Sequence, residues 1–226
     1  MDYSLIIPIY NEDKTLNSLL SQLKKFDNNI EIIIINDGST DTTKSILERE
    51  NNIIVFHNKI NKGKGFSIIK GVGLASRNNI ILMDGDLEIE LKSIHNLIKE
   101  FEKNNNQVIT GKRWNEESNT GLGINTYGNH LINYLFNFLY NTKLTDVLCC
   151  VKIIKKDLLE SIQLKSVGFN IEMEIMSKLV KRNINIYEKN VIYNRRSNEK
   201  GKKLKLSDGW GIIYEMFKNK FKNFKL

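Results

Sequence analysis

The feature that most constrains the fold of this chain is a series of short aliphatic runs separated by amphipathic segments. The run at residues 31–35 contains four consecutive isoleucines. Similar runs lie at residues 4–9, 53–56, 80–83 and 107–110. Segments with helical spacing of apolar residues separate them, at 13–26, 41–50, 64–76 and 91–103. Strands without polar positions need cover on both faces, so the pattern predicts an α/β fold with a mostly parallel central sheet and helices on both faces.

Beyond residue 111 the alternation is less regular. The sequence predicts a helix at 127–140, a strand at 151–154, a helix at 168–182, an extended segment at 184–193 and a basic loop at 195–205. No internal repeat or linker is evident, so we expect a single domain over residues 1–226, with halves at 1–112 and 113–205 and a tail at 206–226.

The tail predicts a basic amphipathic helix. Its apolar residues stand among lysines and are Trp210, Ile213, Phe217, Phe221 and Phe224. Such a helix suits a membrane surface. The alternative is that the apolar stripe packs on the body of the protein.

Charge and cysteine usage limit the partners and the compartment. The net charge of +8 favours an anionic partner, whether phosphates, nucleic acid or an anionic membrane, unless it reflects a lysine-rich proteome. The adjacent pair Cys149 and Cys150 is a poor framework for a disulfide or a metal, which indicates a reducing compartment. No apolar run approaches the roughly 20 residues of a membrane span. We therefore expect a cytoplasmic protein, either free or peripheral on the cytoplasmic face of a membrane.

Acidic residues alternate where the run at 80–83 ends, at Asp84, Asp86 and Glu88. Open α/β sheets bind ligands at the carboxyl ends of their strands. Carboxylates there can hold a hard divalent cation, which can in turn hold phosphates. The alternative is a solvated turn after a strand.

Two other strand ends carry candidate ligands for a nucleoside. Pro8, the only proline, stops strand pairing. Tyr10 could stack on a base and Glu12 could accept from a base or a ribose hydroxyl, although Asn11 as a helix cap would explain the same segment. Asp37 follows the second strand and could also accept from a nucleoside, whereas Asp41 is expected to cap the next helix.

Residues 61–65 place two glycines before a predicted helix, where backbone N–H groups can face an anion. The segment is neither a Walker loop nor a GxGxxG motif.

In this order the loops closely resemble those of the family 2 glycosyltransferases of the GT-A fold, particularly the polyprenyl-phosphate (dolichol-phosphate) mannosyl- and glucosyltransferase branch. The matching segments are residues 6–12, 36–41, 61–65, 83–88 and 111–113, then Asp146, Glu174, 193–196 and 201–203. The resemblance spans nearly the whole chain, and it implies a nucleotide-sugar-binding half at 1–112 and an acceptor half at 113–205.

The resemblance also implies a role for individual residues. Asp84 and Asp86, with Gly85 between them, would form the DxD motif that binds a metal–diphosphate, with Mg²⁺ or Mn²⁺ as the metal. Glu88 stands where this branch often places a further metal ligand. The other donor-binding residues would be Pro8, Tyr10, Glu12, Ile35, Asp37, Lys64 and Arg113. Phosphates would also be bound from the basic loop, by Arg196, Lys202 and Lys203.

Departures from the family pattern lie mostly on the acceptor side. Cys150 and Val151 stand where the branch usually has Gly-Phe, and Lys202 stands where Ser is common. On the donor side, Asn36 replaces a frequent Asp, and Gly85 replaces an alanine, which we expect to be tolerated.

The implied reaction is inverting transfer of a sugar from a nucleoside-diphosphate sugar, with Asp86, Asp146 and Arg196 as catalytic candidates. A lipid phosphate is already ionised and needs no general base, whereas a sugar hydroxyl does. Asp146 is the best candidate for that base, and its alternative role is to hold a loop or a cation. The basic loop favours polyprenyl phosphate as the acceptor. A hydroxyl of a glycolipid or cell-surface polysaccharide is the alternative.

Other functional classes fit less well. The acidic triad argues against a non-catalytic nucleotide-binding module, and no basic groove with interleaved aromatics indicates nucleic acid. His57, His95 and His130 match no ligand spacing. Glu174 fits the family pattern, and we expect it to orient the basic loop.

Overall fold

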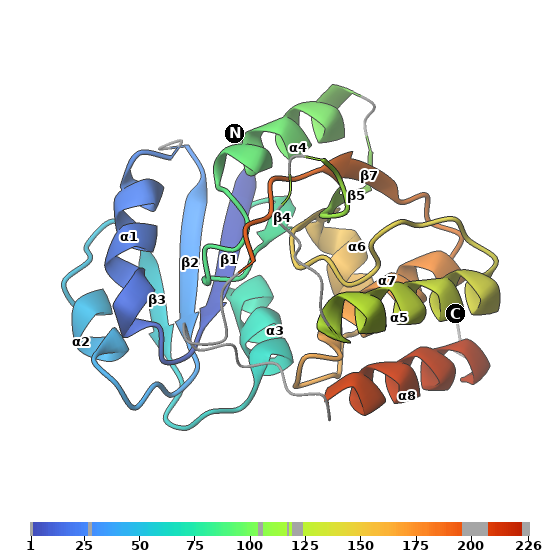
Figure 1. Cartoon of the computed structure of the whole chain (residues 1–226). Helices are drawn as coiled ribbons and strands as arrows, with labels where there is room; N and C mark the ends of the chain where they lie inside the picture. Colours follow the sequence, from blue (N-terminus) through green and yellow to red (C-terminus); the bar gives the residue numbers. More distant parts are fainter. Residues whose placement is uncertain are drawn as a thin grey trace.

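The computed structural model describes residues 2–26, 29–103, 106–116, 118, 124–195 and 208–222. The strands are β1 (Tyr3–Ile9), β2 (Glu31–Asn36), β3 (Ile54–His57), β4 (Asn79–Leu82), β5 (Val108–Lys112), β6 (Lys152–Lys155) and β7 (Tyr187–Asn190). They form one sheet in the order β3-β2-β1-β4-β6-β5-β7 (Figure 1).

The helices lie around this sheet. They are α1 (Asp13–Lys24), α2 (Thr43–Leu47), α3 (Lys64–Leu74), α4 (Lys92–Lys103), α5 (Ile124–Tyr140), α6 (Lys156–Ser161), α7 (Ile171–Lys181) and α8 (Asp208–Phe221). The predicted mostly parallel α/β architecture is therefore confirmed. Among the described helices, none has the length and apolar character needed to cross a membrane.

The first four strands form a parallel unit. β1 lies between β2 and β4, with Ile7 opposite Ile34 and Ile6 opposite Leu82. β6 runs antiparallel to both β4 and β5, and β7 pairs with β5 in parallel. Because parallel strands end at one edge, the loops after β1, β2 and β4 come together there.

Alternate residues of the strands fill two cores. Leu5, Ile7 and Ile9 of β1 pack with α1 and α4 on one face. Ile6 of β1 and Ile35 of β2 pack with α3, α6 and α7 on the other. Both faces are apolar because both are covered, as the uninterrupted aliphatic runs require.

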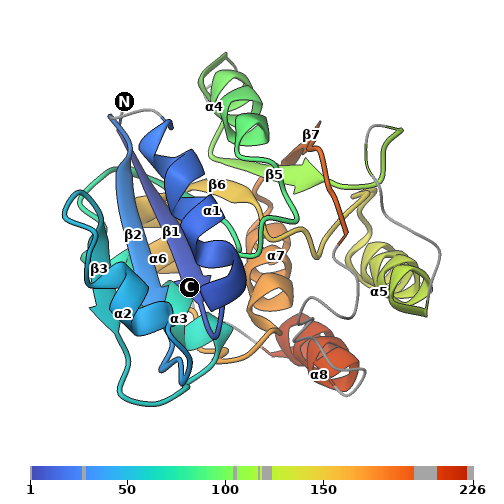
Figure 2. The same ribbon diagram turned by 60° about the vertical axis from the view of Figure 1, so that its left-hand side comes forward.

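A third apolar cluster joins α5 and α8 to α7 beside the sheet (Figures 1 and 2). The tail therefore does dock, but among the described residues of the stripe that its sequence indicates, only Ile213 packs in this cluster. Ile212 and Met216 are the buried contacts of α8, whereas Trp210 and Phe221 are exposed. The helix turns a narrower apolar face inward and leaves its largest aromatics outside.

Two elements differ from expectation. The helix predicted at 41–50 is reduced to the five residues of α2. The six-residue helix α6 was not predicted, because it is too short for a hydrophobic period to be recognised.

Candidate functional site

The loops after β1 and β2 are joined by hydrogen bonds at the carboxyl edge of the sheet. The Asp37 N–H donates to the Ile9 carbonyl at 2.8 Å. Asn11 has a positive φ of 49°, and its Oδ1 accepts from the Thr40 N–H at 2.8 Å. The two loops expected to surround a nucleoside are thus held side by side.

The side chains of the first loop have mixed environments. Pro8 and Tyr10 are half-buried at this edge, and Glu12 is buried with its Oε2 accepting from Thr15 Oγ1 at 2.9 Å. The N-cap of α1 is Glu12, so the cap expected at Asn11 was wrong by one residue. Ile35 is fully buried in the core beneath α3. Contact of these residues with a nucleoside stays a prediction.

A similar shift of one residue occurs at α2. Its N-cap is Thr42 rather than Asp41. The Asp41 carboxylate instead accepts from the N–H groups of Thr43 at 3.0 Å and Asp13 at 3.2 Å. It therefore links the first turns of two helices.

Asp37 organises the glycine-containing segment. Its side chain is only 3% exposed and accepts from Asn58 Nδ2 at 2.7 Å. The backbone N–H groups of Lys62 and Gly63 also donate to it, at 2.9 and 2.7 Å. In this structure the anion that the segment faces is therefore Asp37 itself.

The two glycines of this segment are required by close packing. A Cβ on Gly63 would lie 2.3 Å from the Val167 carbonyl oxygen, and one on Gly65 would lie 2.1 Å from that of Ser166. Gly63 also has a φ of 97°, which disfavours other residues. The glycines thus let α3 begin directly against residues 166–167.

Among the described residues, Lys64 is a cation in direct contact with the acidic motif. Its Nζ lies 2.7 Å from Asp84 Oδ1 and 2.9 Å from Glu172 Oε1. Burial opposes the charged form, but the carboxylates of Asp84 and Glu172 outweigh it and hold the pKa of Lys64 well above its ordinary value. A permanently charged ammonium at this position can bind a diphosphate.

Glu172 also pairs with the fully buried Lys152 of β6. Burial raises the pKa of Glu172, yet Lys152 and Lys64 more than offset this and lower it overall. Sequence reasoning gave neither Glu172 nor Lys152 a role. The available signal was a lysine inside an otherwise aliphatic strand, because a buried lysine needs a counter-charge.

The acidic motif is packed tightly against β1. A Cβ on Gly85 would lie 2.4 Å from Ile9 Cγ2 and 3.1 Å from Ile7 Cγ2. Gly85 is therefore the residue that fits beside these isoleucines, which gives a physical reason for its replacing the family's alanine.

Asp84 and Asp86 suit a hard divalent cation that also binds a diphosphate. Both side chains are half-buried, and their carboxylate oxygens are the donors that Mg²⁺ and Mn²⁺ prefer. Within the described ranges, no three Asp, Glu, His or Cys side chains converge on one point. The fit is thus to a cation that takes one or two carboxylates and completes its shell with substrate phosphates.

Glu88 connects the acidic motif to the start of the basic loop. Its Oε2 accepts from Tyr193 Oη at 2.8 Å, and its carbonyl accepts from the Asn194 N–H at 2.7 Å. Arg195 donates from Nη1 to Thr126 Oγ1 of α5 at 3.2 Å. The phosphate-binding candidates Arg196, Lys202 and Lys203 lie outside the described residues.

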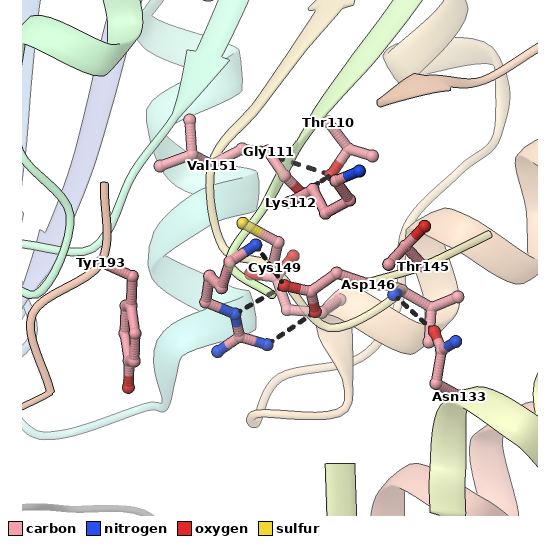
Figure 3. Close-up of polar contacts among 12 residues, drawn as sticks. Thr110, Gly111, Lys112, Asn133, Thr145, Asp146, Cys149, Val151 and Tyr193 are labelled. Atoms are coloured by element: carbon pink, nitrogen blue, oxygen red, sulfur yellow. Dashed lines mark hydrogen bonds and ion pairs between the residues drawn. The ribbon is translucent and has the colours of Figure 1, made fainter. Parts of the chain in front are cut away.

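Arg113 and Asp146 form a bidentate ion pair (Figure 3). The guanidinium donates from Nε and Nη2 to the two carboxylate oxygens, each at 2.8 Å, and the Arg113 N–H donates at 3.0 Å. Asp146 is 2% exposed. Burial opposes the charge on Arg113, but Asp146 outweighs it and keeps the pKa well above its ordinary value. The Arg113 guanidinium therefore stays charged at this position.

Neighbouring groups hold this pair in place. The Asp146 N–H donates to Glu188 Oε1 at 2.9 Å, and the Val147 N–H donates to Asn133 Oδ1 at 3.0 Å. The Arg113 guanidinium lies 5.5 Å from the centre of the Tyr193 ring. Since Tyr193 also bonds to Glu88, one aromatic residue connects the Arg113–Asp146 pair with the acidic motif.

Glu174 lies in the first turn of α7 and is 1% exposed. Its carboxylate accepts from the N–H groups of Lys165 at 2.9 Å and Ser166 at 2.7 Å, and pairs with Lys178. It therefore fixes residues 165–166, against which the glycine-containing segment packs. Orientation of the basic loop by Glu174 stays a prediction, because residues 196–205 lie outside the described residues.

Both cysteines are free thiols. Burial raises the pKa of Cys149 to about 12, and burial together with the nearby Asp84 raises that of Cys150 well above its ordinary value. Protonated thiols are poor metal ligands and poor nucleophiles.

Comparisons with known proteins agree with this arrangement. The sequence profile described as Glycosyl transferase family 2 matches residues 4–163. The uncharacterized protein MJ0544 of Methanocaldococcus jannaschii is 28% identical over 82% of this chain and 85% of its own length. Dodecaprenyl-phosphate galacturonate synthase of Rhizobium johnstonii is 26% identical over 73% of this chain, which spans only 51% of that synthase.

A solved structure with the same fold is glucosyl-3-phosphoglycerate synthase from Mycobacterium tuberculosis, in complex with Mn²⁺, uridine diphosphate and phosphoglyceric acid. It superposes with a TM-score of 0.75 over 98% of this chain and 79% of that chain, at 16% sequence identity. The expected GT-A fold is thereby confirmed.

Proposed function

This chain belongs to glycosyl transferase family 2, and from that membership we propose that it moves a sugar from a nucleoside-diphosphate sugar to a polyprenyl-type lipid phosphate, with inversion at the anomeric carbon. The relative named for dodecaprenyl phosphate supports the choice of acceptor. The observation that carries the proposal is the bidentate Arg113–Asp146 pair, because it bears on whether a general base is present.

Asp146 is poorly placed to remove a proton from an acceptor. Its two oxygens already accept from three donors of Arg113, so both are engaged in the ion pair and neither is directed at an acceptor hydroxyl. A phosphate acceptor is already ionised near neutral pH and needs no base. We therefore assign Asp146 to the positioning of Arg113 and favour a lipid phosphate over a sugar hydroxyl.

The donor half of the proposal rests on the cations at the sheet edge. Lys64 and Arg113 would stabilise the negative charge that develops on the departing diphosphate. Asp84 and Asp86, with Glu88 beside them, would hold a divalent cation that supplies further neutralisation of the diphosphate when bound. Pro8, Tyr10, Glu12, Ile35 and Asp37 would form the nucleoside side of the site.

The acceptor half rests on the basic loop. Arg196, Lys202 and Lys203 would hold the lipid phosphate while it attacks the anomeric carbon from the face opposite the diphosphate. The C–O bond to the diphosphate breaks as the new C–O bond forms, so the configuration inverts. A lipid acceptor would place the protein at the cytoplasmic face of a membrane.

The test is transfer from a panel of nucleotide sugars, with Mg²⁺ or Mn²⁺, to polyprenyl phosphate or to hydroxyl-bearing glycolipids. We expect a sugar phospholipid as the product. Asp84→Ala and Asp86→Ala should each abolish metal-dependent donor binding, while Asp157→Ala, at an exposed position of α6, should not. Transfer only to hydroxyls would overturn the proposed acceptor, and failure to bind any nucleotide sugar would overturn the enzymatic role.

A further inference from the structure

Two neighbouring helices expose large apolar side chains at the same spacing. On α5 they are Tyr127, Leu131, Tyr134 and Phe138, and on α8 they are Trp210, Tyr214, Phe217 and Phe221. In each helix these are positions i, i+4, i+7 and i+11, which fall within about 60° of one another at about 3.6 residues per turn. We call these eight residues the aromatic platform.

The platform lies on the side of the two helices that faces away from the protein. The opposite side of α5 buries Ile132 and Phe136, and that of α8 buries Ile212 and Met216, in one shared cluster. Tyr140 Oη donates to the Met216 carbonyl at 2.8 Å and joins the two helices. They lie side by side in both ribbon views (Figures 1 and 2).

The acidic and aromatic side chains of α8 are placed opposite to those of an amphipathic helix whose outer face contacts water. Beyond its first residue, its only acidic residue is Glu215, which is 1% exposed. Glu215 accepts from Asn170 at 3.2 Å and from Asn219 at 3.0 Å on the inner side, and it pairs with Lys218 at 3.0 Å. Meanwhile Phe138 of α5 is 79% exposed and Trp210 of α8 is 76% exposed. A surface in contact with water alone would place the carboxylate outside and the aromatics inside.

The composition of the exposed side matches an anionic, partly apolar partner. α5 contains no Asp, Glu, Lys or Arg, and α8 carries Lys218 and Lys220 in its last turn. Trp and Tyr are the residues that favour the boundary between headgroups and acyl chains, and lysines beside them can reach lipid phosphates. Exposed apolar side chains that gather on neighbouring helices commonly mark a surface that contacts a membrane or another protein.

The platform is also connected to the candidate site. The His130 ring of α5 lies tilted against the Trp114 ring with 4.4 Å between ring centres, and the Arg113 guanidinium lies 5.2 Å from the centre of the Trp114 ring. Asn133 of α5 accepts from the Val147 N–H next to Asp146. The helix that carries half of the platform therefore supports the Arg113–Asp146 pair.

We propose that the aromatic platform docks on an anionic lipid bilayer, with α5 and α8 lying in the headgroup layer. This inference rests on the proposed function in one respect, because docking would present the acceptor side of the site to a lipid phosphate in the same layer. The aromatic side chains supply the apolar contact, and Lys220 of α8 supplies attraction to anionic headgroups.

The experiment is co-sedimentation of the full chain with vesicles of phosphatidylcholine containing phosphatidylglycerol, compared with phosphatidylcholine alone. Phe138→Ser and Trp210→Ser each remove one aromatic side chain that docking on the bilayer would bury. We therefore expect each substitution to weaken vesicle affinity about tenfold. Ile54→Ser, in the edge strand β3 at the other end of the sheet, is the matched control and should bind as the wild type does. Circular dichroism establishes that each variant is folded.

The outcomes separate this inference from the proposed function. Vesicle binding that is absent, or unchanged in both platform variants, overturns the platform. A concentration-dependent dimer in light scattering that the same variants abolish identifies a second copy as the occupant and also overturns it. Transfer to a short, water-soluble polyprenyl phosphate without vesicles tests the proposed function alone, and the platform variants should retain that rate.

Discussion

The replacement of Glu172 by Gln tests whether the buried charges beneath the candidate site act as a unit. Glu172 bridges Lys64, which points at Asp84, and Lys152, which is fully buried. Gln keeps the shape of the side chain but removes the negative charge. Lys64 would keep Asp84 as its ionic partner, whereas Lys152 would keep the Cys149 carbonyl and lose the carboxylate that pairs with it.

The expected loss follows from the burial of the pair. Lys152 is 0% exposed and Glu172 is 4% exposed, so water cannot replace the missing carboxylate. Removing one partner of a buried ion pair costs about 3–5 kcal/mol, a large part of the roughly 5–15 kcal/mol that stabilises a typical domain. The second effect is on function. Without the Glu172 carboxylate to hold its ammonium in place, Lys64 should be less well positioned for a donor diphosphate, and the KM for the donor should rise.

Urea denaturation, followed by circular dichroism, measures the first effect as a lower midpoint at unchanged slope. Glu160→Gln is the matched control, because Glu160 is paired with Lys156 at 3.7 Å on the surface and such pairs contribute at most about 1 kcal/mol. Adding Lys152→Met to Glu172→Gln should recover much of the stability, since it removes the uncompensated charge. If Glu172→Gln costs no more than Glu160→Gln, the account of the buried network is wrong.

Three further substitutions test separate parts of the site. Gly85→Ala should destabilise the protein by about 1–3 kcal/mol in thermal unfolding, because the added Cβ would lie 2.4 Å from Ile9 Cγ2. The control is Gly73→Ala in α3, whose added Cβ meets no atom within 4 Å. It should be neutral or stabilise the protein by up to about 1 kcal/mol. Asp37→Asn should lower the free energy of unfolding measured in urea by about 1–3 kcal/mol and raise the donor KM, because one amide oxygen cannot accept from all three present donors. An unchanged donor affinity would contradict this prediction. Burial raises the pKa of Glu174, but hydrogen bonds from the Lys178 side chain and from backbone N–H groups outweigh it and lower the pKa below 4.5. The ionised Glu174 carboxylate therefore stabilises the folded protein above that pH, and this stabilisation is lost as the pH falls further. The slope of stability against pH in acid should therefore be shallower in Glu174→Gln, and an identical slope would refute the assignment.

Local pattern was sufficient for most of the fold. The isoleucines of β2 and the leucine spacing of α1 can be recognised within a few consecutive residues. This is possible because the burial of a strand or of one helix face depends on residues that are close in sequence. The short helix α6 escaped because six residues contain less than two helical turns. Capping residues were misplaced by one position at Asn11 and Asp41, since the sequence does not reveal where the helical backbone begins.

The candidate site divides in the same way. The order of the loops after β1, β2 and β4 indicated a metal–diphosphate site, because parallel strands must end at one edge. The partner of each charged group could not be predicted in this manner. Arg113 meets Asp146 across 33 residues, and Lys152 meets Glu172 across 20.

The sequence by itself determined the parallel sheet, the family resemblance and the acidic motif at Asp84 and Asp86, because each depends on residues close together in the chain. Only the tertiary structure decided that Asp37 binds the glycine-containing segment, that Asp146 is committed to Arg113, and that α8 turns Glu215 inward and its aromatics outward. The physical reason is that periodicity specifies which faces of a helix are apolar, whereas the packing of distant segments selects which of those faces, and which charges, find a partner within the protein.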